Sequence, residues 1–348
     1  MSLTIKEVGN IHDMVQFVGI PETITAYREM GAEVEPDRPA NYNPAFNPVH
    51  QHLKTACFMV CRDNMPVGRI AAIKDFLNPD AGTGFFGCFE CENDAEAASA
   101  LLGAVQRWLL NNGCPRMIGP ATFNTNQQVG FLMEGSEYGP RPMLPYNPPY
   151  YCELMEKSGL VKHADLFSFS WFKDMGIPPQ MSRAAERARR NPAVSIKTLK
   201  FRDMRYEALL VRDMFNQSMS ANWGFIPLTT AESLSIIKFC RTYADRDLLI
   251  TVWVEERPAG ILIFLPTSLS GTTPPRSARL SILGVAPRYR YRGLDSYMIS
   301  HAFNIFSEKD YDSADISMIH EDNKILLKTV TQAAGLKQTR LYRVYGTG

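Results

Sequence analysis

The sequence contains the same order of predicted elements twice, and this internal repeat constrains the fold more than any other feature. Residues 58–70, FMVCRDNMPVGRI, align without a gap with residues 250–262, ITVWVEERPAGIL, at a shift of 192 residues. In both segments an apolar strand enters a short polar turn and a second strand follows, which is the pattern of a β-hairpin. Further along, 147–160 aligns with 323–336 at a shift of 176 residues, and each predicts a helix that ends at a Gly-Leu pair. Two copies of one domain are therefore expected.

Between the hairpin and this helix, each copy places another apolar strand and an amphipathic helix. Each copy then continues with a strand, the Gly-Leu helix and a last strand. The remaining predicted strands are 85–91, 116–119 and 166–172 in the first copy and 278–285, 314–318 and 340–345 in the second. In the second copy, one face of the amphipathic helix carries Leu294, Tyr297, Met298, His301 and Ile305.

This order predicts an α/β (α+β) fold with two tandem domains, each a mixed, mostly antiparallel sheet flanked by helices. A chain of 348 residues is long enough for two domains with separate cores. We expect an N-terminal domain at 1–172, a linker with a short helix at 173–195, and a C-terminal domain at 196–348. Prolines at both ends of the linker segment and its many arginines support that division.

Composition argues against several classes of partner. The 37 Lys and Arg residues nearly equal the 36 Asp and Glu residues, so a net charge of +1 predicts no broad attraction to nucleic acid or to a membrane surface. No apolar stretch approaches the roughly 20 residues that span a bilayer. Seven cysteines, an odd number without a secretion signal, predict reduced core thiols and a cytoplasmic protein. Cys88 and Cys91 form a CxxC, but in a strand they point to opposite faces, so no metal site is expected.

A basic loop follows a strand in the second copy. The strand Ser281–Val285 runs through Ala286-Pro287 into Arg288-Tyr289-Arg290-Tyr291-Arg292-Gly293-Leu294, where a helix begins. Unpaired backbone N–H groups and the helix dipole meet at such a point and favour anions. Three arginines add bidentate donors that suit phosphates, although a surface turn with incidental arginines is the alternative.

This loop resembles the cofactor loop of the GCN5-related N-acetyltransferase (GNAT) superfamily. Val285, Pro287, Arg290 and Gly293 match its pattern, whereas Tyr291 stands at the usual first glycine. Asp295 replaces the last small residue. The stretches GFFGCFEC, MLPYNPPYY and SANWGFIPLT, with Glu321-Asp322-Asn323, are similar to a bacterial group in which two such domains are fused.

The resemblance implies an acyltransferase, of the N-acetyltransferase type, that uses acetyl-CoA or another acyl-CoA as co-substrate and no metal. The thioester is expected between two splayed parallel strands, its carbonyl polarised by the backbone N–H of Gly284 or Val285, and a small-molecule or peptide amine attacks it directly. The implied cofactor-binding residues are Gly284, Val285, Arg288, Arg290, Tyr291, Arg292, Gly293, Leu294 and Asn323.

The first copy lacks this basic loop. At the corresponding place it reads Glu90-Cys91-Glu92-Asn93-Asp94, and these carboxylates would repel phosphates. We therefore expect coenzyme A to bind only the second copy. The first, with a degenerate loop, would serve structure or wall the acceptor site.

Catalytic candidates lie at the end of strand 314–318 and on the last strand. Glu321, ahead of His320, is the candidate base for the amine proton, although helix capping explains the same region. The tyrosine that protonates the thiolate in many family members is absent, because Val330-Thr331 stands in its place. Tyr342 or Tyr345, on the last strand, is the candidate replacement, although aromatic residues of a strand are more often core.

Asn222 and Trp223 lie in the region that lines the acceptor pocket of similar proteins, although a lone tryptophan is more often packing. Two other functions stay open. One is a catalytically degenerate GNAT-like protein that binds or senses a ligand. The other is an aminoacyl or long-chain acyl transferase, which would need a basic groove or a long apolar tunnel.

Overall fold

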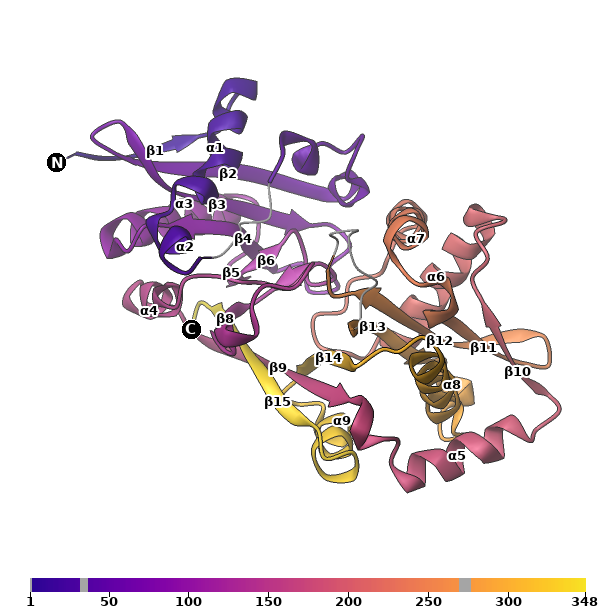
Figure 1. Ribbon diagram of the computed structural model, residues 1–348. Helices are drawn as coiled ribbons and strands as arrows, with labels where there is room; N and C mark the ends of the chain where they lie inside the picture. The colour runs from indigo at the N-terminus through magenta and orange to yellow at the C-terminus, as the bar shows by residue number, and fades with distance from the viewer. Residues whose placement is uncertain (1, 32–36, 269–276) are drawn as a thin grey trace. The chain divides into compact units, whose positions relative to one another are not determined.

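A computed structural model describes residues 2–31, 37–268 and 277–348 (Figure 1). The chain forms two compact units, Met1–Leu166 with Arg340–Gly348, and Phe167–Thr339. Each unit has the same five-strand core, in the order β1-β2-β3-β4-β5 in the first and β10-β11-β12-β13-β14 in the second. In both, the first four strands pair antiparallel and the last two pair parallel. The predicted tandem of mixed, mostly antiparallel sheets flanked by helices is confirmed.

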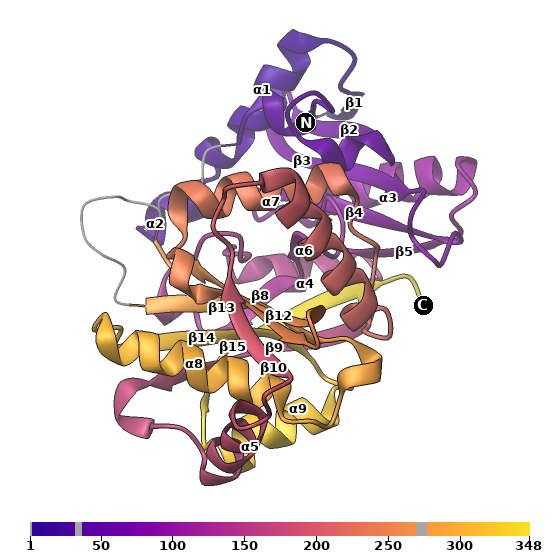
Figure 2. The same ribbon diagram turned by 90° about the vertical axis from the view of Figure 1, so that its right-hand side faces the viewer.

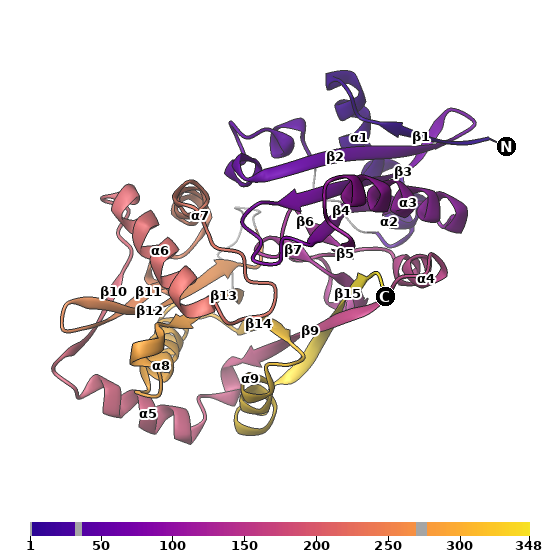
Figure 3. The ribbon, with the colours of Figure 1, turned by 180° about the vertical axis from the view of Figure 1, so that it is seen from behind.

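The first unit places α3 on one face of its sheet (Figure 3). Its strands are β1 (Leu3–Glu7), β2 (Leu53–Arg62), β3 (Met65–Asp75), β4 (Thr83–Cys91), β5 (Arg116–Gly119), β6 (Ala121–Thr122), β7 (Gln128–Val129) and β8 (Phe131–Glu134). Its helices are α1 (Ile11–Thr23), α2 (Thr25–Glu29), α3 (Ala95–Asn111) and α4 (Tyr150–Lys157). The strand β9 (Val161–Phe172) begins in this unit and ends in the second.

The second unit places α6 and α7 on one face of its sheet and α8 on the other (Figure 2). Its strands are β10 (Val194–Thr198), β11 (Leu249–Val254), β12 (Arg257–Pro266), β13 (Ser277–Val285) and β14 (Ser313–His320). Its helices are α5 (Pro179–Arg189), α6 (Met204–Met219), α7 (Thr230–Tyr243), α8 (Leu294–Glu308) and α9 (Lys324–Lys328), which continues as a π-helical turn over Thr329–Ala333. Alternate residues of β11 and β12 enter the two cores, as the period of a strand requires.

The two hairpins repeat in backbone detail. Asp63 and Asn64 join β2 to β3 with φ of 48° and 68°, and Glu255 and Glu256 join β11 to β12 with φ of 50° and 59°. Positive φ at both central residues is the type I′ geometry of two-residue hairpins. A register shift also falls between Val60 and Cys61 and again between Val252 and Trp253, at the same shift of 192 residues.

Two segments differ from the expected layout. The linker helix α5 belongs to the second unit, where it packs along α8 and buries Ala185 and Ala188. The last strand, β15 (Lys337–Gly346), ends in the first unit, because its C-terminal part pairs with β5 at Tyr345 and with β8 at Tyr342. Apolar alternation alone does not reveal with which sheet a strand pairs.

β13 carries a β-bulge in its pairing with β12, at the point where its ladder with β14 ends. Against β12, Ile263 pairs with Ile282 and Phe264 with Leu280, so that Ser281 is an extra residue. The parallel ladder with β14 ends at the pair Leu280 and Ile316, although β13 continues to Val285 and β14 to His320. A bulge increases local twist and interrupts pairing, so the two strands part beyond this point. We call the space between Ser281–Val285 and Ser317–His320 the strand opening.

Close approach of α6 to the opening requires a glycine at position 284. A Cβ atom there would lie 2.1 Å from Ser218 Oγ and 2.6 Å from Ser218 Cβ. We expect Gly284→Ala to lower the free energy of unfolding by about 2 kcal/mol, because overpacking forces α6 or β13 to move. Denaturant titration measures this change. The double variant Ser218→Gly/Gly284→Ala should recover most of the loss, and a single variant as stable as the native chain would contradict the close packing.

Candidate active site

The backbone of β13 presents the N–H of Val285 to the strand opening. The N–H of Ala286 donates to the carbonyl of Ala259 at 2.9 Å, and Val285 lies opposite Gly260. Hydrogen-bonded and non-hydrogen-bonded pairs alternate along an antiparallel ladder. The pair of Gly260 and Val285 is therefore non-hydrogen-bonded, and the N–H of Val285 points away from β12. By the same alternation the N–H of Gly284 faces β12, so of the two predicted donors the geometry favours Val285.

The basic loop joins β13 to the N-terminus of α8, and its three arginines differ in role. The Nη2 of Arg290 donates to the Ser218 carbonyl at 2.9 Å, which ties the loop to α6. The guanidinium groups of Arg288 and Arg292 lie 4.7 and 5.5 Å from the ring centre of Tyr289 and are exposed to solvent. Tyr289 is buried, so both cations lie against a ring that the fold holds in place. Arg288 and Arg292 are thus the two cations best placed for an anionic ligand.

Tyr291 keeps the backbone shape of the glycine that it replaces. Its φ is 63°, in the left-handed region that glycine adopts without strain, and its side chain is fully exposed. The next glycine, Gly293, caps α8 with φ of 73°, and Leu294 begins the helix with its side chain buried. The exposed Asp295 in the first turn is the one acidic group in this part of the loop.

At the end of β14 the structure brings two predicted residues together. The ring of Trp223, in the loop after α6, stacks on His320 at 4.9 Å between centroids and 18° between planes. The Nδ1 atom of His320 accepts a hydrogen bond from the N–H of Asp322 at 3.1 Å. This bond engages the lone pair of Nδ1 and places the ring proton on Nε2. His320 is therefore a weaker candidate for the base than Glu321, which begins the turn after β14.

The other predicted residues have ordinary structural contacts. Asn222 is exposed and donates from Nδ2 to the Met219 sulfur at 3.1 Å. The side chain of Asn323 caps α9 by accepting from the N–H of Leu326 at 3.2 Å. Tyr342 is 1% exposed and belongs to the first unit, whereas Glu321 belongs to the second. The sequence pattern of the last strand does not show to which unit the strand belongs.

The first unit has the same backbone geometry, but there a tyrosine hydroxyl accepts the hydrogen bond of the equivalent backbone N–H. Cys91 lies opposite Gly68, and the N–H of Glu92 donates to Val67, so Cys91 corresponds to Val285. The parallel ladder of β4 and β5 likewise ends early, at Phe85 and Ile118. Here the N–H of Cys91 donates to the Tyr151 hydroxyl at 3.1 Å. The backbone N–H of Cys91 is therefore already hydrogen-bonded within the protein.

The acidic residues of the first unit are also engaged. Glu90 accepts hydrogen bonds from the hydroxyls of Tyr151, at 2.7 Å, and Tyr27, at 2.9 Å. Burial raises the pKa of Glu90, and Arg69 opposes this rise. Burial and the neighbouring Glu90 raise the pKa of Tyr151 well above its usual range, so that its hydroxyl remains a donor. Both groups are therefore hydrogen-bonded within the protein, and coenzyme A binding by the second copy alone stays a prediction.

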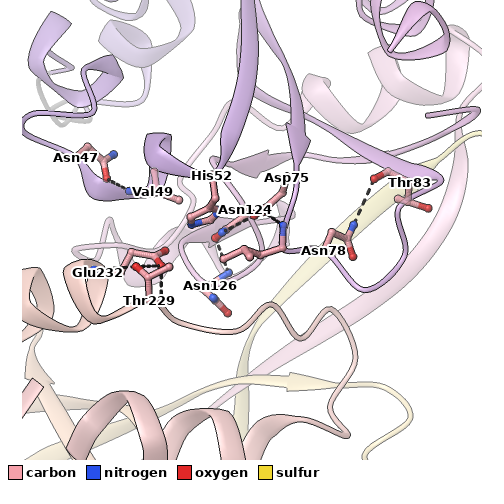
Figure 4. Close-up of polar contacts among 11 residues, drawn as sticks. Asn47, Val49, His52, Asp75, Asn78, Thr83, Asn124, Asn126, Thr229 and Glu232 are labelled. Carbon is pink, nitrogen blue, oxygen red and sulfur yellow. Dashed lines mark hydrogen bonds and ion pairs between the residues drawn. The ribbon is translucent and has the colours of Figure 1, made fainter. Parts of the chain in front are cut away.

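A buried polar cluster joins the ends of β2 and β3 in the first unit (Figure 4). The Nδ1 of His52 lies 2.8 Å from Asp75 Oδ1, and the Nδ2 of Asn124 donates to Asp75 Oδ2 at 3.0 Å. The N–H of Leu77 donates to the same carboxylate at 2.8 Å. His52 is thus held in a buried hydrogen-bonded cluster, which gives it a structural role.

Neither a metal cluster nor a membrane-spanning helix is present in the described ranges. There, no three His, Cys, Asp or Glu side chains gather closely enough to hold an ion. Nor is any helix of residues 2–31, 37–268 and 277–348 long and apolar enough to cross a bilayer.

The chain is similar in fold and in sequence to known proteins. No protein-family model matches the chain. Among solved structures, a tandem GNAT protein from the clavulanic acid biosynthesis pathway matches with a TM-score of 0.59 at 12% identity, covering 99% of this chain and 98% of its own. A GNAT protein from Sphaerobacter thermophilus matches with a TM-score of 0.52 at 12% identity, covering 99% and 95%. The chain has a tandem GNAT fold.

Two curated proteins are similar to this chain in sequence. Protein YghO of Escherichia coli (strain K12) is 24% identical over 379 residues, covering 96% of each chain. A protein named bacterial ceramide synthase, from Caulobacter vibrioides, is 27% identical over 331 residues, covering 87% of this chain and 86% of the relative. The likeness therefore runs through both units of the chain.

Proposed function

We propose that this protein transfers an acyl group from acyl-CoA to an amine, and that the second GNAT unit does so. The observation that carries the proposal is the strand opening, where the N–H of Val285 faces a gap between two parallel strands. A basic loop and a helix N-terminus follow directly on the same strand. A thioester carbonyl in the opening and phosphates at the loop would use both features at once.

The reaction needs few groups from the protein. The N–H of Val285 donates to the thioester oxygen, which gains negative charge as the amine nitrogen attacks the carbonyl carbon. One well-placed donor of this kind contributes about 3 kcal/mol to lowering the barrier. Glu321 takes the proton that the amine loses. The new C–N bond forms, the C–S bond breaks, and the departing thiolate takes a proton from solvent.

The proposed cofactor contacts divide between backbone and side chains. Val285 polarises the carbonyl, Gly284 admits α6, and Gly293 and Leu294 open the helix whose first N–H groups face the phosphates. Arg288 and Arg292 supply positive charge, Arg290 holds the loop in place, and the fully exposed Tyr291 leaves the loop backbone accessible.

A long-chain substrate is the second candidate. A ceramide is an amide between a fatty acid and a long-chain amino alcohol, so the name of the Caulobacter relative describes acyl transfer to an amine. That likeness favours a long-chain acyl-CoA and an amino-alcohol acceptor for this chain as well. A comparison of acetyl-CoA with palmitoyl-CoA, each with short and long amines, separates the two candidates.

Binding of coenzyme A tests the loop. We expect Arg288→Ala/Arg292→Ala to weaken acetyl-CoA binding by about 2 to 4 kcal/mol, because two charge-assisted contacts to phosphate are lost. Calorimetry should find one site per native chain, with an affinity that falls as salt rises. Arg202→Ala/Arg205→Ala removes the same charge from the exposed start of α6 and should bind normally. Two equal sites, or normal binding by the loop variant, would refute the assignment.

Thiol release tests the base. In the native protein, acetyl-CoA or palmitoyl-CoA mixed with an amine panel should release free thiol. Glu321→Gln should lower turnover by roughly 100-fold or more, the usual contribution of a positioned base, and leave acyl-CoA affinity nearly unchanged. Unaltered turnover would assign the proton to solvent instead. Binding of acyl-CoA without thiol release by the native protein would favour the alternative of a binding or sensing protein.

A further inference from the structure

A second basic segment lies beside the basic loop. The helix α5 packs against α8 within the same unit (Figure 2). At the N-terminus of α8, a Cβ atom on Gly293 would lie 2.7 Å from the Ala184 carbonyl oxygen and 3.3 Å from the Ala184 Cβ atom. Only a glycine allows the two backbones to approach this closely. Arg292 immediately precedes Gly293, so the middle of α5 lies against the point where the basic loop enters α8.

A second contact gives the direction of α5 relative to this point. Glu186 raises the pKa of Arg189 through hydrogen bonds, and Tyr297, in the first turn of α8, adds to this rise. Arg189 therefore lies close to Tyr297, whereas Ala184 lies beside the glycine that precedes the helix. Arg183 adjoins Ala184, so it is nearer to the basic loop than Arg189 is.

The arginines of this helix divide into a paired and an unpaired set. Glu186 accepts hydrogen bonds from Arg189 Nε at 2.8 Å and from Arg190 Nε at 2.7 Å, which offsets part of their charge. Arg183 and Arg187 are exposed to solvent and have no ion-pair partner among the described residues. They stand four residues apart, so they are neighbours on one side of the helix. Both guanidinium groups are thus accessible to a ligand.

A coenzyme A molecule carries phosphate at two separate places. Its diphosphate leads to the thioester arm, and its 3′-phosphate is attached to the ribose. The 3′-phosphate is a monoester, which carries a charge of about −1.5 to −2 at pH 7 in addition to the charge of the diphosphate. Arg288 and Arg292 supply two exposed cations at the loop, and Arg183 and Arg187 supply two more on the adjacent helix. Each guanidinium can bind a phosphate through two hydrogen bonds.

We infer that Arg183 and Arg187 bind the 3′-phosphate of acyl-CoA, so that α5 makes the site selective for coenzyme A over thioesters that lack this phosphate. This inference rests on the proposed function. It assigns the diphosphate to Arg288 and Arg292 and the 3′-phosphate to the helix that the close contact at Gly293 holds beside them. The arginines of α5 act in binding alone and take no part in the transfer of the acyl group.

Calorimetry with coenzyme A and with 3′-dephospho-coenzyme A tests the inference. The native protein should bind coenzyme A more tightly by at least about tenfold, the contribution of a charge-assisted contact to phosphate. Arg183→Ala/Arg187→Ala should bind the two ligands about equally, through a loss of affinity for coenzyme A alone. Arg288→Ala/Arg292→Ala should instead weaken the binding of both ligands and keep the native ratio of their affinities.

Two matched variants separate a specific contact from a general effect of charge. Arg202→Ala/Arg205→Ala removes the same charge from the exposed start of α6 and should keep the whole preference for coenzyme A. Arg183→Lys/Arg187→Lys keeps the charge without the guanidinium fork and should keep part of it. Equal binding of both ligands by the native protein, or a native ratio in Arg183→Ala/Arg187→Ala, overturns the inference and leaves the proposed function intact. Absence of binding of either ligand to the native protein overturns both.

Discussion

One extra residue in β13 is the feature on which the proposed site depends. Ser281 breaks the register with β12, and the ladder with β14 ends at the preceding residue. Without this bulge, the N–H of Val285 would pair with a neighbouring strand, as it does in a regular sheet. The sheet thus gives up several backbone hydrogen bonds where a ligand would gain them. The basic loop can serve the same ligand only because it continues directly from β13.

The two units share this backbone geometry but differ in the side chains around it. Both carry a bulge and a parallel ladder that ends early, and both direct a backbone N–H away from the preceding antiparallel strand. In the first unit the Tyr151 hydroxyl accepts that hydrogen bond, and Glu90 in turn accepts from Tyr151. In the second unit the equivalent loop is basic and exposed. If the proposed function holds, side chains rather than the fold decide which copy accepts an acyl thioester.

Much of the fold could be predicted from the sequence because most elements occur twice, so that the pattern of one copy supports the assignment in the other. The hairpins at 58–70 and 250–262 agree in turn type and in register shift. It was harder to predict which strands pair with one another, because apolar alternation shows the two faces of a strand and not its neighbours in the sheet. The end of β15 therefore lies in a different unit from the one expected, and Tyr342 lies with it.

The site could be predicted in outline only. The arginine pattern predicted the position of the basic loop. The role of Arg290 in holding this loop to Ser218 depends on a contact between segments that are distant in the sequence. The choice between Gly284 and Val285 depends on the register of the ladder with β12. The pairing of Cys91 with Tyr151 also needed the structure, since 60 residues separate them.

Amide hydrogen exchange at Cys91 and Val285, followed by NMR with and without acetyl-CoA, tests most directly that only the second unit offers its backbone donor to a thioester. We expect slow exchange at Cys91 in both samples, because Tyr151 already accepts its hydrogen bond. At Val285 we expect exchange to slow by at least about tenfold when acetyl-CoA binds, as one new hydrogen bond in a buried site would produce. Slowing at Cys91, or unchanged exchange at Val285 in a sample saturated with acetyl-CoA, would contradict it.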